Sequence, residues 1–305
     1  MMKVEEELAG FSAEKDTMLT IGVFDGVHLG HKYLLSQLKE HARQQNLLSG
    51  VVTFRQHPLE VLPSPTGLAF LTDLPTRTGL LKAEGIDAIV TLSFTTELAQ
   101  LGAGEFISLL QKYLRMRALL VGPDFTLGRN QETDCNALHK LGRDMNFDVI
   151  VVPHIVLDGA VVSSTAIRQA LAKGNMERVL NLTGRPFSLH GRVATGAGRE
   201  IGFPTANIEI DPRQALPTDG VYVTRAYING QAYKSVTNIG QRPTFGRNKR
   251  TIEVHILDYG SELYGCELKI DVIKRLRPEK QFDSPDQLKK QIAEDIKLSR
   301  AILDC

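Results

Sequence analysis

Two histidines stand in a glycine-rich turn near the start of the chain. The stretch "TIGVFDGVHLGHKYLL" (Thr20–Leu35) carries His28 and His31, interspersed with Gly26 and Gly30. A strand-like run precedes them and a helix-like run follows, so the turn would offer unpaired backbone N–H groups and the positive end of a helix dipole. Imidazole can hydrogen-bond a phosphate whose negative charge grows as a bond breaks. We interpret the turn as a candidate phosphate-binding site. Surface histidines without a role, or half of a metal site, would give the same residues.

A second group of polar residues lies in "VVSSTAIRQAL". Ser163, Ser164 and Thr165 fall where a helix should start, and Arg168 lies one turn further on. Hydroxyls, N–H groups and a guanidinium in this arrangement could all face one anion. A plain N-cap followed by a surface arginine explains the same residues.

The second half of the chain contains a turn of similar interest, "GREIGFPTANI" (Gly198–Ile208). Pro204 fixes the backbone before Thr205 and Asn207, whose hydroxyl and amide are two residues apart. Both groups could therefore face one magnesium-phosphate group. A turn that simply leads into a strand accounts for the same residue types.

One carboxylate, Glu253, lies in the alternating stretch "TIEVHILDY". It shares a strand face with His255, opposite Ile252, Val254 and Ile256. Taken by itself, a glutamate on an exposed strand face is most often a solvated surface residue.

The first-half residues are predicted to sit on a doubly wound domain. From Met18 to about Gly184, short apolar runs rich in β-branched residues alternate with amphipathic segments. The runs are "MLTIGVF", "GVVTF", "DAIVTL", "ALLVG" and "DVIVVP". Their nearly continuous apolarity is typical of strands buried on both faces of a parallel sheet, and the alternation indicates an α/β fold.

The second-half residues are predicted to sit on an antiparallel barrel or sandwich. After Asn181–Phe187 the apolar residues alternate with period two, and Gly, Pro, Asn and Asp separate the runs. A single helix closes the chain, with Ser284 as N-cap and Pro285 at its first position. We place the domains at 1–183 and 184–305.

Composition narrows the class of protein. Hydrophobic residues are 42% of the 305, typical of a folded globular chain, and 36 Lys and Arg balance 35 Asp and Glu. Without a basic field, we expect no nucleic-acid or membrane partner. The cysteines at 135, 266 and 305 have no C-x-x-C spacing, which favours a reducing cytoplasm over a disulfide framework. We find neither a signal peptide nor an apolar stretch of the roughly 18–20 residues that a membrane span needs.

The motifs together resemble a known enzyme family over nearly the whole chain. "GVFDGVHLGH" resembles the H-x-G-H signature of the adenylyl- and cytidylyltransferase superfamily, and "SSTAIR" is similar to its second phosphate-binding element. "TFRQHP", "SFTTELAQL" and "VGPDFTLG" resemble the bacterial flavin-adenylylating branch. "GFPTAN", "LPTDGVY", "NIGQRPTFG", "EVHILD", "LYG" and "LRPEKQFDSPDQL" are similar to the riboflavin kinase domain. The resemblance is to the bifunctional bacterial riboflavin kinase/FMN adenylyltransferases.

This resemblance implies a Rossmann-like nucleotidyltransferase domain, a Greek-key β-barrel with a closing helix, and two reactions. In the barrel, Glu253 would take the proton of the riboflavin 5′-hydroxyl as it attacks the γ-phosphorus of ATP, with Thr205 and Asn207 holding Mg²⁺ and the phosphates. In the first domain, the FMN phosphate would attack the α-phosphorus of a second ATP, giving FAD and pyrophosphate. His28 and His31 would stabilise the developing charge.

The resemblance also implies further contacts. The ATP- and phosphate-binding set would be Gly22, Phe24, Asp25, Gly26, Gly30, Ser164, Thr165, Arg168, Gly202, Pro204, Thr205 and Asn207. The flavin-binding set would be Asp124, Phe125, Arg242 and Arg277. The expected partners are riboflavin, FMN and ATP alone, and the expected state is a monomer or weak homo-oligomer.

Three positions depart from the family pattern. Val23 stands where the family has Asn, and Gln131 and Thr133 stand where it has a glycine and an acidic residue. These changes leave open a single-activity riboflavin kinase with an inactive adenylyltransferase domain. A flavin-binding regulator without turnover is a third hypothesis, against which the retained Glu253 and histidines speak.

Overall fold

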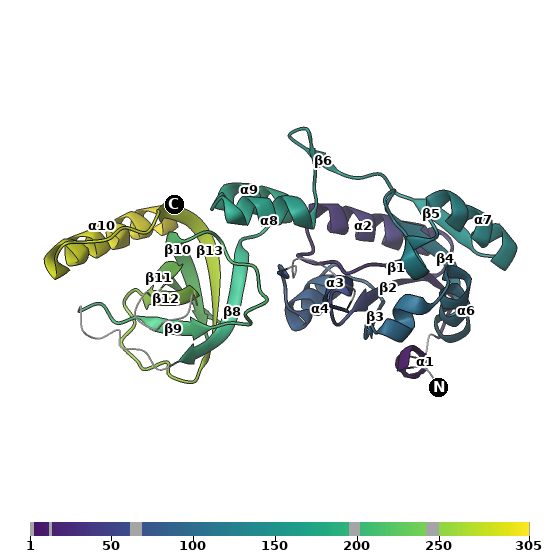
Figure 1. Cartoon of the computed structure of the whole chain (residues 1–305), viewed down its shortest axis with the longest axis horizontal. Helices are drawn as coiled ribbons and strands as arrows, with labels where there is room; N and C mark the ends of the chain where they lie inside the picture. The colour runs from purple at the N-terminus through teal and green to yellow at the C-terminus, as the bar shows by residue number, and fades with distance from the viewer. Residues whose placement is uncertain (1–2, 12–13, 62–68, 195–201, 242–249, 305) are drawn as a thin grey trace. The chain divides into compact units, whose positions relative to one another are not determined.

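The computed structural model describes residues 3–11, 14–61, 69–194, 202–241 and 250–304 (Figure 1). The chain divides into two compact units, Met1–Ser164 and Thr165–Cys305. Within the described ranges, no helix combines the length and the apolar composition needed to cross a bilayer.

A five-stranded parallel sheet forms the centre of the first unit, in the order β3-β2-β1-β4-β5. The strands are β1 (Thr17–Ile21), β2 (Leu48–Phe54), β3 (Ala88–Leu92), β4 (Met116–Val121) and β5 (Asp148–Val151). Every residue of β1 is buried, which confirms a strand covered on both faces. β1 and β4 are neighbours although far apart in sequence, and the crevice beyond the carboxyl ends of such a pair is where this fold binds ligands.

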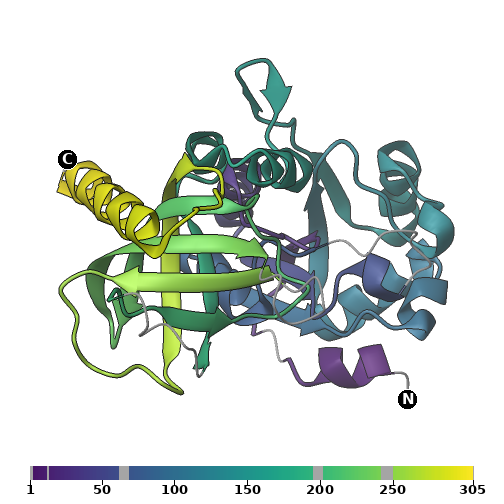
Figure 2. The same ribbon diagram turned by 60° about the vertical axis from the view of Figure 1, so that its left-hand side comes forward.

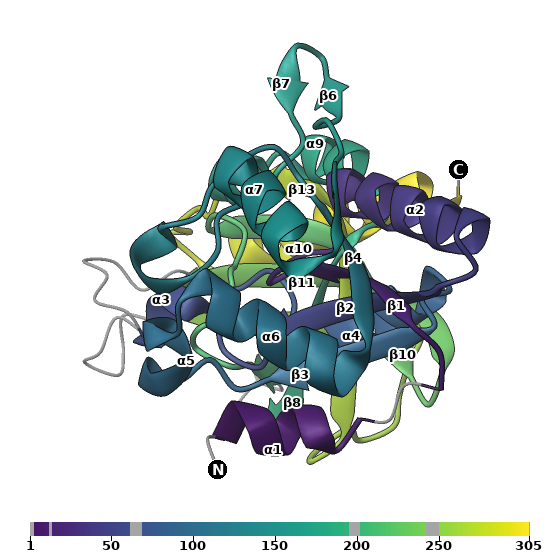
Figure 3. The same ribbon diagram turned by 90° about the vertical axis from the view of Figure 1, so that its right-hand side faces the viewer.

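Helices cover both faces of this sheet (Figure 3). The helices of this unit are α1 (Lys3–Ala9), α2 (Leu29–Gln44), α3 (Pro58–Val61), α4 (Leu74–Ala83), α5 (Thr96–Gln100), α6 (Ala103–Leu114) and α7 (Cys135–Met145), with a 3₁₀ turn at Arg129–Gln131. Met18 packs with α2 and α4 on one face, whereas the next residue, Leu19, packs with α1 and α6 on the other. Successive strand residues point to opposite faces, so the sheet holds two cores and is doubly wound as predicted. A hairpin of β6 (Val156–Leu157) and β7 (Ala160–Val161) projects from the unit.

The second unit is a closed antiparallel barrel in the order β10-β11-β12-β9-β8-β13. Its strands are β8 (Phe187–Ala194), β9 (Ala206–Glu209), β10 (Gly220–Ile228), β11 (Gln231–Gln241), β12 (Arg250–Ile256) and β13 (Glu267–Arg277). Two short helices, α8 (Ser164–Ala172) and α9 (Met176–Thr183), precede the barrel. Of the two folds that the alternating pattern allowed, the structure has the barrel, whose closure leaves no exposed sheet edge.

The closing helix α10 (Pro285–Asp304) lies against strands β10 and β11 of the barrel (Figure 2). Its predicted cap is confirmed, because the Ser284 hydroxyl accepts a hydrogen bond from the Gln287 N–H at 3.3 Å. An ion pair ties it to β13, since Arg277 Nη2 lies 2.8 Å from Asp295 Oδ2 and the Asp295 side chain is 4% exposed. A buried pair with this geometry fixes the position of the helix.

Candidate active sites

The histidine turn has a backbone that few sequences could adopt. Between β1 and α2, the φ angle is positive at Phe24 (55°), Gly26 (82°) and Val27 (34°). A Cβ atom at Gly26 would also lie 2.9 Å from Leu71 Cδ1, so the turn needs glycine for conformation and for space. The tight turn brings the start of α2 directly to the end of β1.

The two predicted histidines are adjacent in this turn. His28 is the N-cap of α2, and its Nδ1 accepts a hydrogen bond from the His31 N–H at 3.3 Å. The two rings are stacked, with their centroids 3.7 Å apart and their planes 18° apart. His28 is 5% exposed, so it is packed in place rather than a solvated surface residue.

A buried carboxylate, Asp25, anchors the turn to a neighbouring loop. Both Asp25 oxygens accept from the Leu71 N–H at 2.9 Å, and Oδ1 also accepts from the Thr72 N–H at 3.0 Å. The Thr72 hydroxyl in turn accepts from the Gly26 N–H at 3.0 Å. Asp25 is 3% exposed and does not line the cavity described below. These contacts hold the turn against the loop at Leu71 and Thr72.

The segment predicted as a second phosphate-binding element begins beside the same turn. The Ser164 hydroxyl donates to the Asp25 carbonyl at 2.8 Å. A Cβ atom at Gly30 would lie 3.0 Å from the Val162 carbonyl oxygen, so the chain before Ser164 passes close to the first turn of α2. Thr165 and Arg168 belong to α8 in the second unit, where Thr165 is exposed and Arg168 is half-buried.

A cavity of about 370 Å³ opens beyond the ends of β1, β4 and β5, at the crevice between β1 and β4. Its lining comprises Thr20, Ile21, Gly22, Val23, Phe24, His28, Gly30, His31, Leu34, Gly122, Asp124, Phe125, Val152, Pro153, His154, Ile155, Val161, Val162, Ser163 and Ser164. Predicted residues from the histidine turn, from "SSTAIR" and from "VGPDFTLG" thus meet at one cavity.

The three departures from the family pattern lie in different surroundings. Val23 lines the cavity, where it also packs against a hydrophobic core. Gln131 is exposed, with a φ of 58°. Thr133 is buried, and its N–H donates to the Leu127 carbonyl at 3.0 Å. Because Leu127 donates back to the Thr133 carbonyl at 2.9 Å, the base of this loop is closed by two backbone hydrogen bonds.

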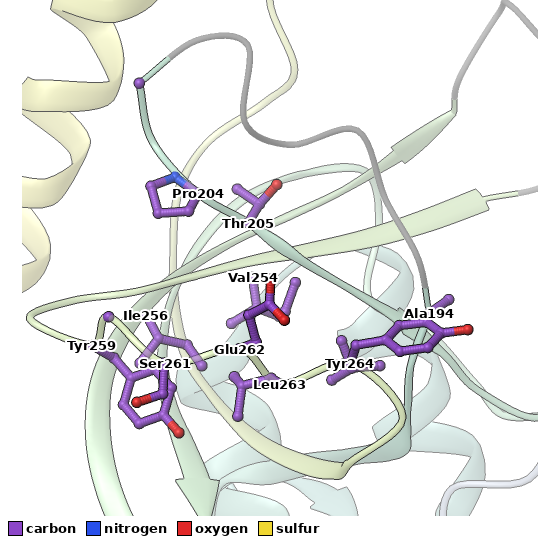
Figure 4. A pocket seen from close by; sticks show the side chains of 14 residues that line it. Ala194, Pro204, Thr205, Val254, Ile256, Tyr259, Ser261, Glu262, Leu263 and Tyr264 are labelled. Atoms are coloured by element: carbon purple, nitrogen blue, oxygen red, sulfur yellow. The ribbon is translucent and has the colours of Figure 1, made fainter.

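In the barrel, a pocket of about 600 Å³ opens at the end where β8 and β12 finish and β9 begins (Figure 4). Its lining comprises Val193, Ala194, Gly202, Pro204, Thr205, Ala206, Val254, Ile256, Tyr259, Gly260, Ser261, Glu262, Leu263 and Tyr264. The predicted residues Gly202, Pro204 and Thr205 therefore share this pocket. His255 holds the backbone there, since its Nδ1 lies 2.8 Å from the Pro204 carbonyl oxygen.

Glu253 and Asn207 lie directly opposite one another on β12 and β9. Opposed residues of antiparallel strands share a face, with Cβ atoms about 4.5–5.5 Å apart. Ile252 is 2% exposed and Val254 is fully buried, which confirms that Glu253 faces away from the barrel interior. Neither Glu253 nor Asn207 lines the pocket, but Asn207 Nδ2 is a buried atom without a hydrogen-bond partner among the described residues.

Of the two predicted flavin-binding arginines, the structure describes Arg277 but not Arg242. Arg277 makes the ion pair with Asp295 and also lies 5.8 Å from the centroid of the Phe282 ring. Arg242 lies outside the described residues.

Several lining or neighbouring polar residues were not predicted from the sequence. His154 lines the first cavity, while Tyr259, Glu262 and Tyr264 line the second. Glu279 accepts a hydrogen bond from Asn238, the residue opposite Glu253 on β11. Only His154 carried a usable signal, because it follows the fifth apolar run in "DVIVVPH" and so stands at the carboxyl end of a predicted parallel strand.

Comparisons with known proteins match both halves of the chain. The profile of a family described as FAD synthetase matches residues 11–166, and that of a family described as riboflavin kinase matches residues 183–303. A protein of Escherichia coli (strain K12) named bifunctional riboflavin kinase/FMN adenylyltransferase is 41% identical over 286 residues, which cover 92% of this chain and 91% of that one. A protein of the same name from Haemophilus influenzae is 34% identical over 290 residues, with 94% of each chain covered. A crystal structure from Streptococcus pneumoniae, described as a macrolide-efflux protein, is 31% identical, has a TM-score of 0.89, and is matched over 98% of this chain and 97% of that chain.

Proposed function

The chain belongs to the family of bifunctional riboflavin kinase/FMN adenylyltransferases, and we propose that residues 1–183 carry its adenylyltransferase site and residues 184–305 its kinase site. The enzyme phosphorylates riboflavin to FMN with ATP, and it then adenylylates FMN with a second ATP to give FAD and pyrophosphate. The observation that carries the assignment of sites is the meeting of the histidine turn, Ser164 and the loop after β4 at one cavity.

In the adenylyltransferase site, the attacking group is the phosphate of FMN, which is already an anion. No protein nucleophile is therefore needed, and the protein's task is to position two substrates and to stabilise charge. We assign that charge stabilisation to His28 and His31, whose stacked rings border the cavity. Ser164, Thr165 and Arg168 would bind the departing pyrophosphate, and Gly22, Phe24, Gly26 and Gly30 would shape the turn around ATP. Asp25 would act by holding that turn.

In the kinase site, Glu253 would accept the proton of the riboflavin 5′-hydroxyl as its oxygen attacks the γ-phosphorus of ATP. Phosphoryl transfer depends mainly on positioning and on neutralising charge, so few protein groups suffice. The pocket bordered by Gly202, Pro204 and Thr205 would hold ATP, with its phosphates toward Asn207. The amide nitrogen of Asn207 is buried and has no hydrogen-bond partner among the described residues, as expected of a group that a bound ligand would engage.

Mg²⁺ fits the donors of the kinase site. The ion prefers oxygen ligands and is often held by one or two protein groups together with substrate phosphates. The Thr205 hydroxyl and the Asn207 amide oxygen are such donors, on neighbouring positions of one strand and its entry. When bound, the metal supplies charge neutralisation at the transferring phosphoryl group.

We further propose flavin contacts at Asp124 and Phe125, which border the first cavity, and at Arg242 and Arg277 in the second unit. The ion pair of Arg277 with Asp295 gives that residue a structural part as well. We also propose a cytoplasmic location, no nucleic-acid or membrane partner, and a monomer or weak homo-oligomer. The single-activity kinase is the less favoured alternative, because the relatives named above carry both activities in their names.

Product analysis of two variants tests the assignment of sites. Glu253→Gln should form no FMN from riboflavin but should still convert added FMN to FAD. His28→Ala should form FMN and lose FAD formation by about 10²–10³-fold, as expected when one preorganised donor is removed. Equal loss of both reactions in either variant would contradict the proposed division of the two sites between residues 1–183 and 184–305.

A further inference from the structure

Two loops of the first unit meet through a polar pair at the edge of its cavity. Asp124 follows β4 and His154 follows β5, and His154 Nε2 lies 2.7 Å from Asp124 Oδ2. Both residues line the cavity that contains His28 and His31. The pair therefore crosses from one strand end to the next at the place where this fold binds ligands.

Stability alone does not account for this pair. The Asp124 side chain is 87% exposed and that of His154 is 37% exposed, and ion pairs so exposed contribute little to folding. Within the described part of the chain, His154 is the one polar partner of the Asp124 side chain. A free surface aspartate would sample several rotamers, so the contact with the imidazole selects one of them.

Only one oxygen of Asp124 is engaged by His154, which leaves Oδ1 to accept from a ligand. A carboxylate accepts hydrogen bonds and repels phosphate, so it would face neutral donors such as hydroxyl groups. Both substrates of adenylyl transfer carry hydroxyls near their phosphates. ATP has the vicinal hydroxyls of its ribose, and FMN has those of its ribityl chain.

We propose that His154 is a positioning residue that holds the Asp124 carboxylate to bind the vicinal hydroxyls of one substrate, while the phosphates of that substrate lie at His28 and His31. This inference rests on the proposed adenylyltransferase site. It assigns to His154 an effect on substrate affinity, with the imidazole acting through Asp124.

Steady-state kinetics of FAD formation with His154→Ala, His154→Gln and Asp124→Ala test the proposal. We expect KM to rise about 10-fold for one substrate in the two alanine variants, the loss typical of one hydrogen bond to a charged group, with kcat little changed. His154→Gln should restore KM in large part, because its amide N–H can still donate to Asp124. His139→Ala, which removes an exposed histidine on α7, serves as the matched control.

The kinetic pattern also identifies the substrate. A raised KM for FMN alone indicates the ribityl chain and agrees with the flavin contact proposed for Asp124. A raised KM for ATP together with a lost preference for ATP over 2′-deoxy-ATP indicates the ribose and would replace that flavin contact. Either pattern supports the proposal. Unchanged KM values in His154→Ala, or a glutamine variant as impaired as the alanine variant, would overturn it. His28→Ala separates this failure from a wrong choice of site, because full FAD formation by that variant would refute the site itself.

Discussion

Removal of the Asp25 carboxylate should loosen the histidine turn and leave the barrel untouched. In Asp25→Ala, the backbone N–H groups of Leu71 and Thr72 lose the acceptor that they now share at 2.9–3.0 Å. Each buried donor left unpaired costs about 2 kcal/mol, so the local free energy of opening should fall by about 4 kcal/mol. Asp25→Asn keeps one acceptor oxygen and should lose about half of that.

Hydrogen exchange followed by mass spectrometry measures this loss in the turn itself. A fall of 4 kcal/mol corresponds to about 1000-fold faster exchange of protected amides. We expect it in peptides covering residues 20–35, while peptides of the barrel strands exchange as in the wild type. FAD formation from added FMN should drop by about 100-fold, because misplacement of catalytic groups by about 1 Å has effects of that size. FMN formation from riboflavin should not change.

Asp73→Ala provides the control, since it removes an aspartate next to the loop that Asp25 anchors. Asp73 caps α4 by accepting from the Thr76 N–H at 2.8 Å, and loss of that cap costs about 1 kcal/mol. Exchange in α4 should rise while both activities persist. If Asp25→Ala left exchange in residues 20–35 unchanged, or lowered both activities equally, the anchoring role of Asp25 would be wrong.

Three further perturbations have defined outcomes. Gly30→Ala should lower FAD formation by about 10-fold or more, because its Cβ would lie 3.1 Å from the His28 ring and 3.0 Å from the Val162 carbonyl; product analysis with added FMN measures this. Asp295→Asn should lower the stability of the barrel by about 3 kcal/mol, since it leaves Arg277 partly buried without its anion; exchange in β13 and α10 reports the loss. Chelation of Mg²⁺ by EDTA should abolish FMN formation, and added Mg²⁺ should restore it, as fluorescence chromatography of the flavins would record.

Each of these has a matched comparison. Gly79→Ala in α4 meets no atom within 4 Å and should leave FAD formation intact, so an equal loss there would contradict the role of space at Gly30. Asp258→Asn removes an exposed partner of Arg300 and should affect stability far less than Asp295→Asn. FMN formation at the ordinary rate in EDTA would exclude a metal from the kinase step.

The ion pair between Asp258 and Arg300 makes the stability of the fold depend on pH, and the pKa of Asp258 gives the direction. Hydrogen bonds from the Arg300 guanidinium hold the pKa of Asp258 below its ordinary value of 3.8. Whatever the pair contributes to stability is therefore complete above that ordinary value, and it is lost as the pH falls through the lower pKa of the folded state. Wild type and Asp258→Asn should differ in unfolding temperature at neutral pH and converge in acid. A difference that persisted unchanged in acid would contradict this linkage.

Local patterns were sufficient for most strands of the fold. Continuous apolar runs predicted the buried parallel strands, and period-two alternation predicted the strands of the second half, because side-chain burial imposes those periods directly. The same pattern could not choose between a barrel and a sandwich, since both bury one strand face. The choice depends on whether β13 closes onto β10, which is a pairing between segments far apart in the chain.

In the candidate sites, too, local groups could be predicted from the sequence and contacts between distant segments could not. Residue types and spacing within short segments predicted His28 and His31 as site residues, because a turn between a strand and a helix presents its groups together whatever the rest of the chain does. Spacing could not show that Asp25 accepts a hydrogen bond from Leu71, since that contact joins residues 46 apart.

Short segments of the sequence were thus enough to predict most strands, the family and the local turns that present His28, His31 and Ser164. Which distant loops meet at each cavity could be learned only from the tertiary structure. His154 shows the difference most clearly, because its sequence position marks a strand end but its partner Asp124 lies 30 residues away. Contacts of this kind follow from the order of strands in the sheet, and that order is set by packing of the whole unit rather than by any short segment.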